Sequence, residues 1–180
     1  MLSWERRTGE SEIRLVRQDM VVGRIQPTRE ANSDFQADWA GDRYRLQSVL
    51  SWTLAYRIEQ PDTGLSARLT FRVTGRRATL QTNVGGQLLL IRIQRRARHW
   101  QLWDIPATKW SKTLSKKNRK TIVQDEQNNP DLILNVYGKA KNMSGVIIQE
   151  QTQMHRLYLL LIIFSLDRFY ARSWSGDYRS

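Results

Sequence analysis

Few residues of this chain have side chains suited to catalysis. Its 180 residues include two histidines, His99 and His155, and no cysteine. A thiolate nucleophile, a disulfide and a cysteine-ligated metal are therefore excluded, and two histidines are too few for a His-rich metal framework. The sequence also lacks a Gly-x-Ser-x-Gly elbow, a His-Glu-x-x-His pair and a P-loop. We expect structural histidines, no metal, no cofactor and no enzyme activity, although spacing alone does not exclude two carboxylates that meet in space.

Positive charge is the strongest chemical signal. The net charge is +12, and residues 92–120 contain ten cations but a single acid, Asp104, which gives this segment a charge of +9. Such a concentration indicates an anionic partner. The candidate ligand-binding residues are Lys109, Lys112, Lys116, Lys117, Arg119 and Lys120, with Trp110 as an interfacial anchor. A secondary basic patch consists of Arg92, Arg95, Arg96 and Arg98.

Three kinds of partner fit a basic segment that contains tryptophan. At a membrane, indole lies at head-group depth and lysines meet anionic lipid. On single-stranded nucleic acid, bases stack on rings while cations meet the backbone. An acidic protein partner is the third alternative, and a solubilising loop without any partner is the fourth.

Short alternating segments separated by turn residues predict ten to twelve strands. The segment 65–74, for example, places Leu65, Leu69 and Phe71 on one face of a strand and Arg68 on the other. The thirteen candidate segments from which these strands are expected are Glu12–Arg17, Asp19–Ile25, Asp34–Trp39, Arg43–Gln47, Trp52–Glu59, Leu65–Thr74, Ala78–Asn83, Gln87–Gln94, Arg98–Asp104, Thr121–Gln124, Leu132–Tyr137, Lys139–Asn142 and Val146–Glu150. Strands joined by hairpins favour an antiparallel barrel or sandwich.

The C-terminal part predicts a helix over residues 153–173. Eight consecutive apolar residues, Leu157 to Phe164, leave no polar face, so this helix must be surrounded by protein or lipid. A membrane span would need about 20 apolar residues, and the run ends before Asp167 and Arg168. A helix of about 21 Å would fit a barrel wall of about 20 Å. These dimensions agree with a barrel of ten to twelve strands around a central helix, with Asp167 and Arg168 at its mouth.

This layout resembles the tubby-like group, which includes tubby C-terminal domains, LURP-one-related proteins and phospholipid scramblases. The resemblance depends on Val146-Ile147-Ile148, the apolar helix Leu157–Leu166 and the late Asp167-Arg168-Phe169, with a strand and turn pattern over the whole chain. It implies a twelve-stranded barrel and, for tubby domains, phosphoinositide binding on the barrel wall. The absence of cysteine and of an Asp-x-Asp-x-Asp-Gly loop means that scramblase acylation and an EF-hand-type calcium loop do not carry over.

Together these patterns predict one domain over residues 1–180 that binds without catalysis. The first hypothesis is docking on anionic lipid or phosphoinositide through the basic segment. The alternative is a scaffold that binds nucleic acid or an acidic protein with the same segment. The N-terminus has no apolar signal-peptide region, so we expect a cytoplasmic protein, peripheral to a membrane under the first hypothesis. Oligomeric state is not predicted.

Overall fold

The structure is a computed structural model, and it describes residues 1–7, 11–28, 34–49, 54–72, 77–83, 86–94, 98–104, 132–139, 142–150 and 156–173. The described chain is mainly β with one C-terminal helix, as predicted. Its strands are β1 (Leu2–Arg6), β2 (Ile13–Arg17), β3 (Met20–Pro27), β4 (Asp34–Trp39), β5 (Asp42–Val49), β6 (Ala55–Gln60), β7 (Leu65–Phe71), β8 (Arg77–Thr82), β9 (Gly86–Gln94), β10 (His99–Asp104), β11 (Leu132–Lys139) and β12 (Asn142–Glu150). The helix is α3 (Arg156–Ser173).

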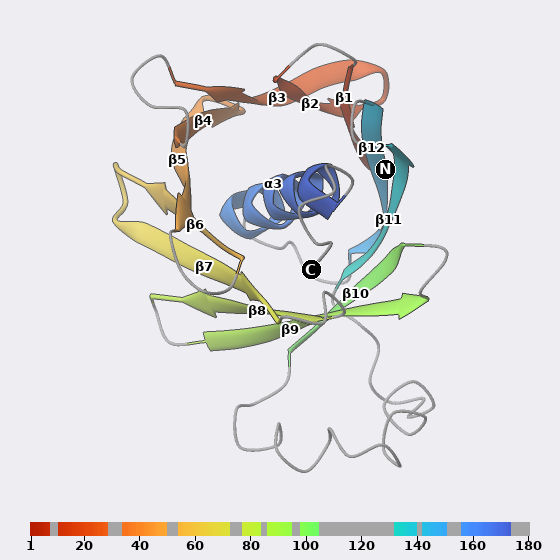
Figure 1. The fold of residues 1–180 in the computed structure, drawn as a ribbon. Helices are drawn as coiled ribbons and strands as arrows, with labels where there is room; N and C mark the ends of the chain where they lie inside the picture. The colour runs from red at the N-terminus through yellow and green to blue at the C-terminus, as the bar shows by residue number, and fades with distance from the viewer. Residues whose placement is uncertain are drawn as a thin grey trace.

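The strands form an antiparallel meander that closes on itself. Each strand pairs with its neighbours in the chain, and β1 pairs with both β2 and β12, so the sheet is a closed barrel with no free edge. Figure 1 shows α3 inside this ring of strands. We call the end of the barrel where α3 begins the proximal end and the end where α3 finishes the distal end. Because neighbouring strands are antiparallel, successive hairpins lie at opposite ends.

The core lies between the helix and the inner faces of the strands. Every residue from Leu159 to Asp167 is buried, with at most 3% of its surface exposed. An α-helix that is apolar all round needs such an enclosure, and the strands supply it by alternating inward apolar and outward polar side chains. In β4, for example, Phe35, Ala37 and Trp39 point inward.

Aromatic rings fill the distal half of the barrel. The ring of Phe164 on α3 lies 4.9 Å from that of Phe35 and 5.6 Å from that of Tyr56. Phe71 continues the cluster and stacks on Phe169 at 4.7 Å. The helix is therefore held by side-chain packing on several sides.

The structure differs from the predicted strands at the N-terminus and at residues 139–142. Strand β1 was not predicted, because Leu2 and Trp4 are too short an alternating pattern to distinguish a strand from a loop. Lys139–Asn142 was predicted as a strand, which is wrong: Lys139 ends β11 and Asn142 begins β12. Gly138 precedes this turn with a φ of +88°, which favours glycine. The predicted strand Thr121–Gln124 lies outside the described residues.

Candidate functional site

Among the described residues, a buried ion pair lies inside the barrel at its distal end. The Nε of Arg6 donates to both carboxylate oxygens of Asp167, at 2.9 and 3.1 Å. The side chain of Asp167 is 0% exposed and that of Arg6 is 11% exposed. Burial raises the pKa of Asp167, while the nearby charges of Arg6 and Arg168 oppose that rise. The expectation that Asp167 reaches solvent at the mouth is therefore wrong: it joins the helix to the end of β1.

Two more polar side chains of α3 are enclosed by aromatic rings at this end. The guanidinium of Arg168 lies 4.3 Å from the ring centre of Phe35. The hydroxyl of Tyr170 accepts a hydrogen bond of 3.1 Å from the indole of Trp100, which is fully buried. These residues fill the space in which a barrel of this kind would hold a ligand, so we look for a site on the outside.

Most sequence-predicted site residues lie outside the described residues. These are Lys109, Trp110, Lys112, Lys116, Lys117, Arg119, Lys120, Arg95 and Arg96. Arg92 lies in β9, but the structure does not describe its side chain. Of the predicted site, only Arg98 has a described side chain.

Arg98 is built into the distal end rather than extended into solvent. Its Nη1 donates to the carbonyl oxygen of Gly138 at 2.7 Å, and its guanidinium lies 4.6 Å from the ring centre of Tyr170. Its backbone has a φ of +47°, which is uncommon for a residue with a side chain. Arg98 therefore joins β10, β11 and α3, and a role in ligand binding would be additional to this structural one.

The fold separates the two halves of the basic segment 92–120. Arg98 lies at the distal end, where β10 begins, whereas Asp104 lies at the proximal end, where β10 ends. Six residues of strand separate the two ends by about 18 Å. The chain leaves the described barrel at Asp104 and returns at Leu132, also at the proximal end. Arg98 and the residues that follow Asp104 therefore connect to the barrel at opposite ends.

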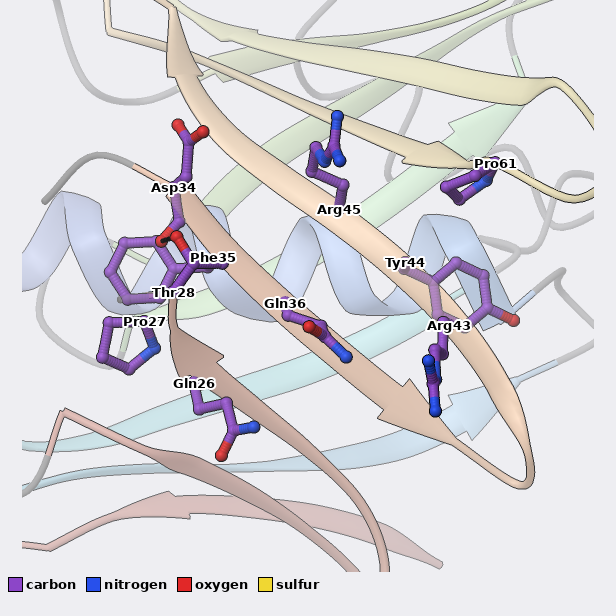
Figure 2. A pocket seen from close by; sticks show the side chains of 10 residues that line it. All are labelled: Gln26, Pro27, Thr28, Asp34, Phe35, Gln36, Arg43, Tyr44, Arg45 and Pro61. Carbon is purple, nitrogen blue, oxygen red and sulfur yellow. Dashed lines mark hydrogen bonds between the residues drawn. The ribbon is translucent and has the colours of Figure 1, made fainter. Parts of the chain in front are cut away.

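One pocket with charged lining residues is a groove on the outer wall of the barrel (Figure 2). It has a volume of about 710 Å³ and crosses β3, β4 and β5. Its lining residues are Gln26, Pro27, Thr28, Asp34, Phe35, Gln36, Arg43, Tyr44, Arg45 and Pro61. Burial is the main cause, and the negative charge of nearby Asp42 a smaller one, that raises the pKa of Tyr44 to about 12. Its phenol therefore remains protonated at neutral pH and does not act as a base.

The arginines of this groove already face carboxylates. Arg43 lies 3.8 Å from Asp38, and Arg45 lies 3.6 Å from Glu59. The groove's own carboxylate, Asp34, accepts a hydrogen bond from Gln47 at 3.3 Å. Two arginines thus stand against three carboxylates, so the groove has no excess of positive charge.

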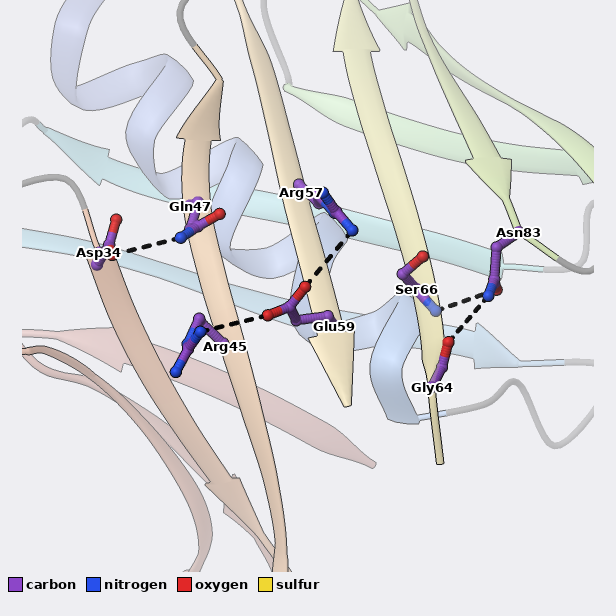
Figure 3. Close-up of polar contacts among 8 residues, drawn as sticks. All are labelled: Asp34, Arg45, Gln47, Arg57, Glu59, Gly64, Ser66 and Asn83. Carbon is purple, nitrogen blue, oxygen red and sulfur yellow. Dashed lines mark hydrogen bonds and ion pairs between the residues drawn. The ribbon is translucent and has the colours of Figure 1, made fainter. Parts of the chain in front are cut away.

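The same pattern continues around the wall (Figure 3). Arg57 lies 3.5 Å from Glu59, so that this carboxylate is shared between two arginines. Further along, Asn83 donates to the carbonyl of Gly64 at 2.9 Å and accepts from the amide of Ser66 at 3.0 Å. These contacts are exposed, and they tie neighbouring strands together without forming a catalytic arrangement.

Sequence reasoning missed Arg6 as the partner of Asp167 and the outward pair Arg43 and Arg45. The first had no sequence signal, because 161 positions separate the two residues. Arg43 and Arg45 occupy alternate positions of a predicted strand, so their shared outward face was visible in the sequence. That they line a groove with Gln26 and Asp34 depended on which strands are neighbours.

Within the described ranges, no group of three or more His, Cys, Asp or Glu residues could hold a metal ion. The same ranges include no helix long and apolar enough to cross a bilayer. Comparison with family models, curated proteins and solved structures finds no match for this chain.

Proposed function

We propose that this protein is a non-catalytic binding module that docks on anionic lipid through basic residues on its outside. The observation that carries the proposal is the filled interior: the aromatic cluster and α3 occupy the space a barrel could offer to a substrate. Any ligand must then meet the outer surface, and the net charge of +12 favours an anionic one.

We further propose that the chain is a tubby-like barrel. The support is its architecture, in which a meander of strands surrounds a C-terminal apolar helix with a late aspartate, Asp167. A phosphoinositide is then the first head group to test. The basic residues predicted from the sequence, Lys109 to Lys120 with Trp110 and the group around Arg98, are the candidates for contact.

Co-sedimentation with vesicles tests this function. One set of vesicles contains phosphatidylcholine alone, a second adds phosphatidylserine, and a third adds a phosphoinositide bisphosphate. We expect sedimentation with the second and third sets and none with the first, because each cation near an anionic leaflet contributes about 1 kcal/mol.

A gel shift with generic oligonucleotides is the parallel measurement. A shift without sedimentation would replace lipid with nucleic acid as the partner. If the protein binds neither acidic vesicles nor oligonucleotides at low salt, the proposal fails and the positive charge serves solubility.

A further inference from the structure

The distal end of the barrel gathers cations from three connections that are far apart in the sequence. Arg72 follows β7, Arg77 begins β8, Arg98 precedes β10 and Lys139 ends β11. We call these four residues the distal rim. Strands β7 to β11 are consecutive neighbours in the sheet, so the four positions lie along one arc of the barrel end. Among the described residues of this arc, none is an aspartate or glutamate.

The proximal end of the same five strands has the opposite character. Its described residues include Asp62 in the turn after β6 and Asp104 at the end of β10, and they include no lysine or arginine. Among the described residues of this sector, charge is therefore separated along the barrel axis, whereas the sequence between Asp104 and Leu132, which lies outside the described residues, contains six cations. Alternate hairpins point to opposite ends, so the antiparallel meander itself creates the asymmetry.

Of the four residues of the distal rim, only Arg98 belongs to the secondary basic patch predicted from the sequence.

The barrel holds the distal rim at fixed positions. The backbone amide of Arg72 donates to the carbonyl of Arg77 at 2.9 Å, which closes that hairpin. The amide of Val136 donates to the carbonyl of Arg98 at 3.2 Å, which joins the next two strands. Five neighbouring strands span about 19 Å, so the four positions are spread across a broad edge of the barrel.

An exposed aromatic side chain accompanies the rim. Tyr137, two residues before Lys139, is 49% exposed, and its hydroxyl accepts a hydrogen bond of 3.0 Å from Asn135. A tyrosine with an apolar ring and a polar tip is typical of the membrane interface. The described part of this surface has neither a row of aromatic rings nor an outward helix, which are the usual devices for reading nucleic acid.

We propose that the distal rim is the surface with which this protein meets an anionic bilayer, with the barrel axis directed toward the membrane and Tyr137 at head-group depth. This inference rests on the proposed function and specifies which end of the molecule carries it. It assigns a lesser part to Lys109–Lys120, whose connection leaves the barrel at the opposite end.

Two charge-matched variants test the assignment. The rim variant is Arg72→Gln/Arg77→Gln/Lys139→Gln, and the control is Lys112→Gln/Lys116→Gln/Lys117→Gln. Arg98 is kept because it contacts Gly138 and Tyr170. With vesicles of phosphatidylcholine and phosphatidylserine, we expect partitioning of the rim variant to fall on the order of a hundredfold, at about 1 kcal/mol for each cation. We expect the partitioning of the control variant to fall by a factor several times smaller than that of the rim variant.

A second measurement needs no change of charge at the rim. The chain has no cysteine, so a single one accepts an environment-sensitive fluorophore. We expect a blue shift on acidic vesicles for Asn142→Cys, at the distal end, and none for Thr63→Cys, at the proximal end.

Each outcome separates the two proposals. If the control variant loses binding and the rim variant keeps it, or if the label at position 63 shifts and that at 142 does not, the rim assignment is overturned while lipid docking stands. If the unmodified protein ignores acidic vesicles, the proposed function itself fails. If the unmodified protein binds oligonucleotides but not vesicles, and the rim variant binds oligonucleotides less, the choice of a bilayer is also overturned.

Discussion

At the scale of single residues, the pair of Arg6 and Asp167 is a polar contact enclosed in the barrel. A carboxylate taken out of water is costly, and here one guanidinium offsets much of that cost. Burial raises the pKa of Asp167 in the folded protein above its ordinary value of 3.8. Protonation of Asp167 therefore contributes its full stabilisation at pH values below 3.8, and this contribution is lost as the pH rises through the folded pKa.

We therefore predict that Arg6→Met destabilises the protein by about 3 kcal/mol at neutral pH, because it leaves Asp167 buried without that charge. The arginine lowers the pKa of Asp167, so its removal raises that pKa further. The loss of stability should shrink as pH falls and Asp167 takes up a proton. Urea unfolding at several pH values measures this.

The neighbouring Arg7→Met is the matched control, because Arg7 is 60% exposed and pairs with Glu5 at 3.3 Å. It should change the free energy of unfolding by less than about 1 kcal/mol. A loss for Arg6→Met that is the same at every pH would contradict the assigned role of Asp167.

Gly145 provides a second prediction at this scale. It pairs with Trp4 across β12 and β1, and a Cβ atom at this position would overlap the indole of Trp4. Gly145→Ala should destabilise the barrel by about 2 kcal/mol, because the indole or the strand must move. Thermal or urea unfolding checks the change, with the outward Ser144→Ala as control.

A double variant makes this test specific. If the overlap with Trp4 is the cause, Gly145→Ala should cost less in a Trp4→Leu background than in the unmodified protein. Equal costs in both backgrounds would assign the effect to the strand backbone instead.

At the scale of elements, α3 depends on packing more than on the charge at its start. Phe164 contacts two aromatic rings of the wall, whereas Arg156 makes an exposed ion pair of 3.2 Å with Asp42. A buried ring removed from a packed core leaves a cavity, while an exposed pair is screened by water.

Phe164→Ala should accordingly lower the free energy of unfolding by about 4 kcal/mol. Arg156→Ala should lower it by less than about 1 kcal/mol. Denaturant unfolding of both variants gives the comparison, and similar losses in the two would mean that the start of the helix matters more than its enclosure.

At the scale of the whole molecule, the meander brings Arg72, Arg77 and Arg98, which are far apart in the sequence, to one end of the barrel. Attachment through exposed cations is screened by salt, since the Debye length falls from about 14 Å at 0.05 M to about 4 Å at 0.5 M. We predict that raising NaCl over this range releases the protein from acidic vesicles. Binding that persists at high salt would indicate that apolar contacts, rather than charge, hold it there.

The sequence by itself determined the secondary structure class, the position of the apolar helix and the sign of the charge, because each follows from residue type and local periodicity. The helix was predicted over 153–173 and begins at Arg156 in the described chain. Residues 151–155 lie outside the described residues. Only the tertiary structure decided that Arg6 pairs with Asp167, and that Arg72, Arg98 and Lys139 share one end of the barrel. Such contacts depend on strand order and direction, which bring together residues that no local pattern relates.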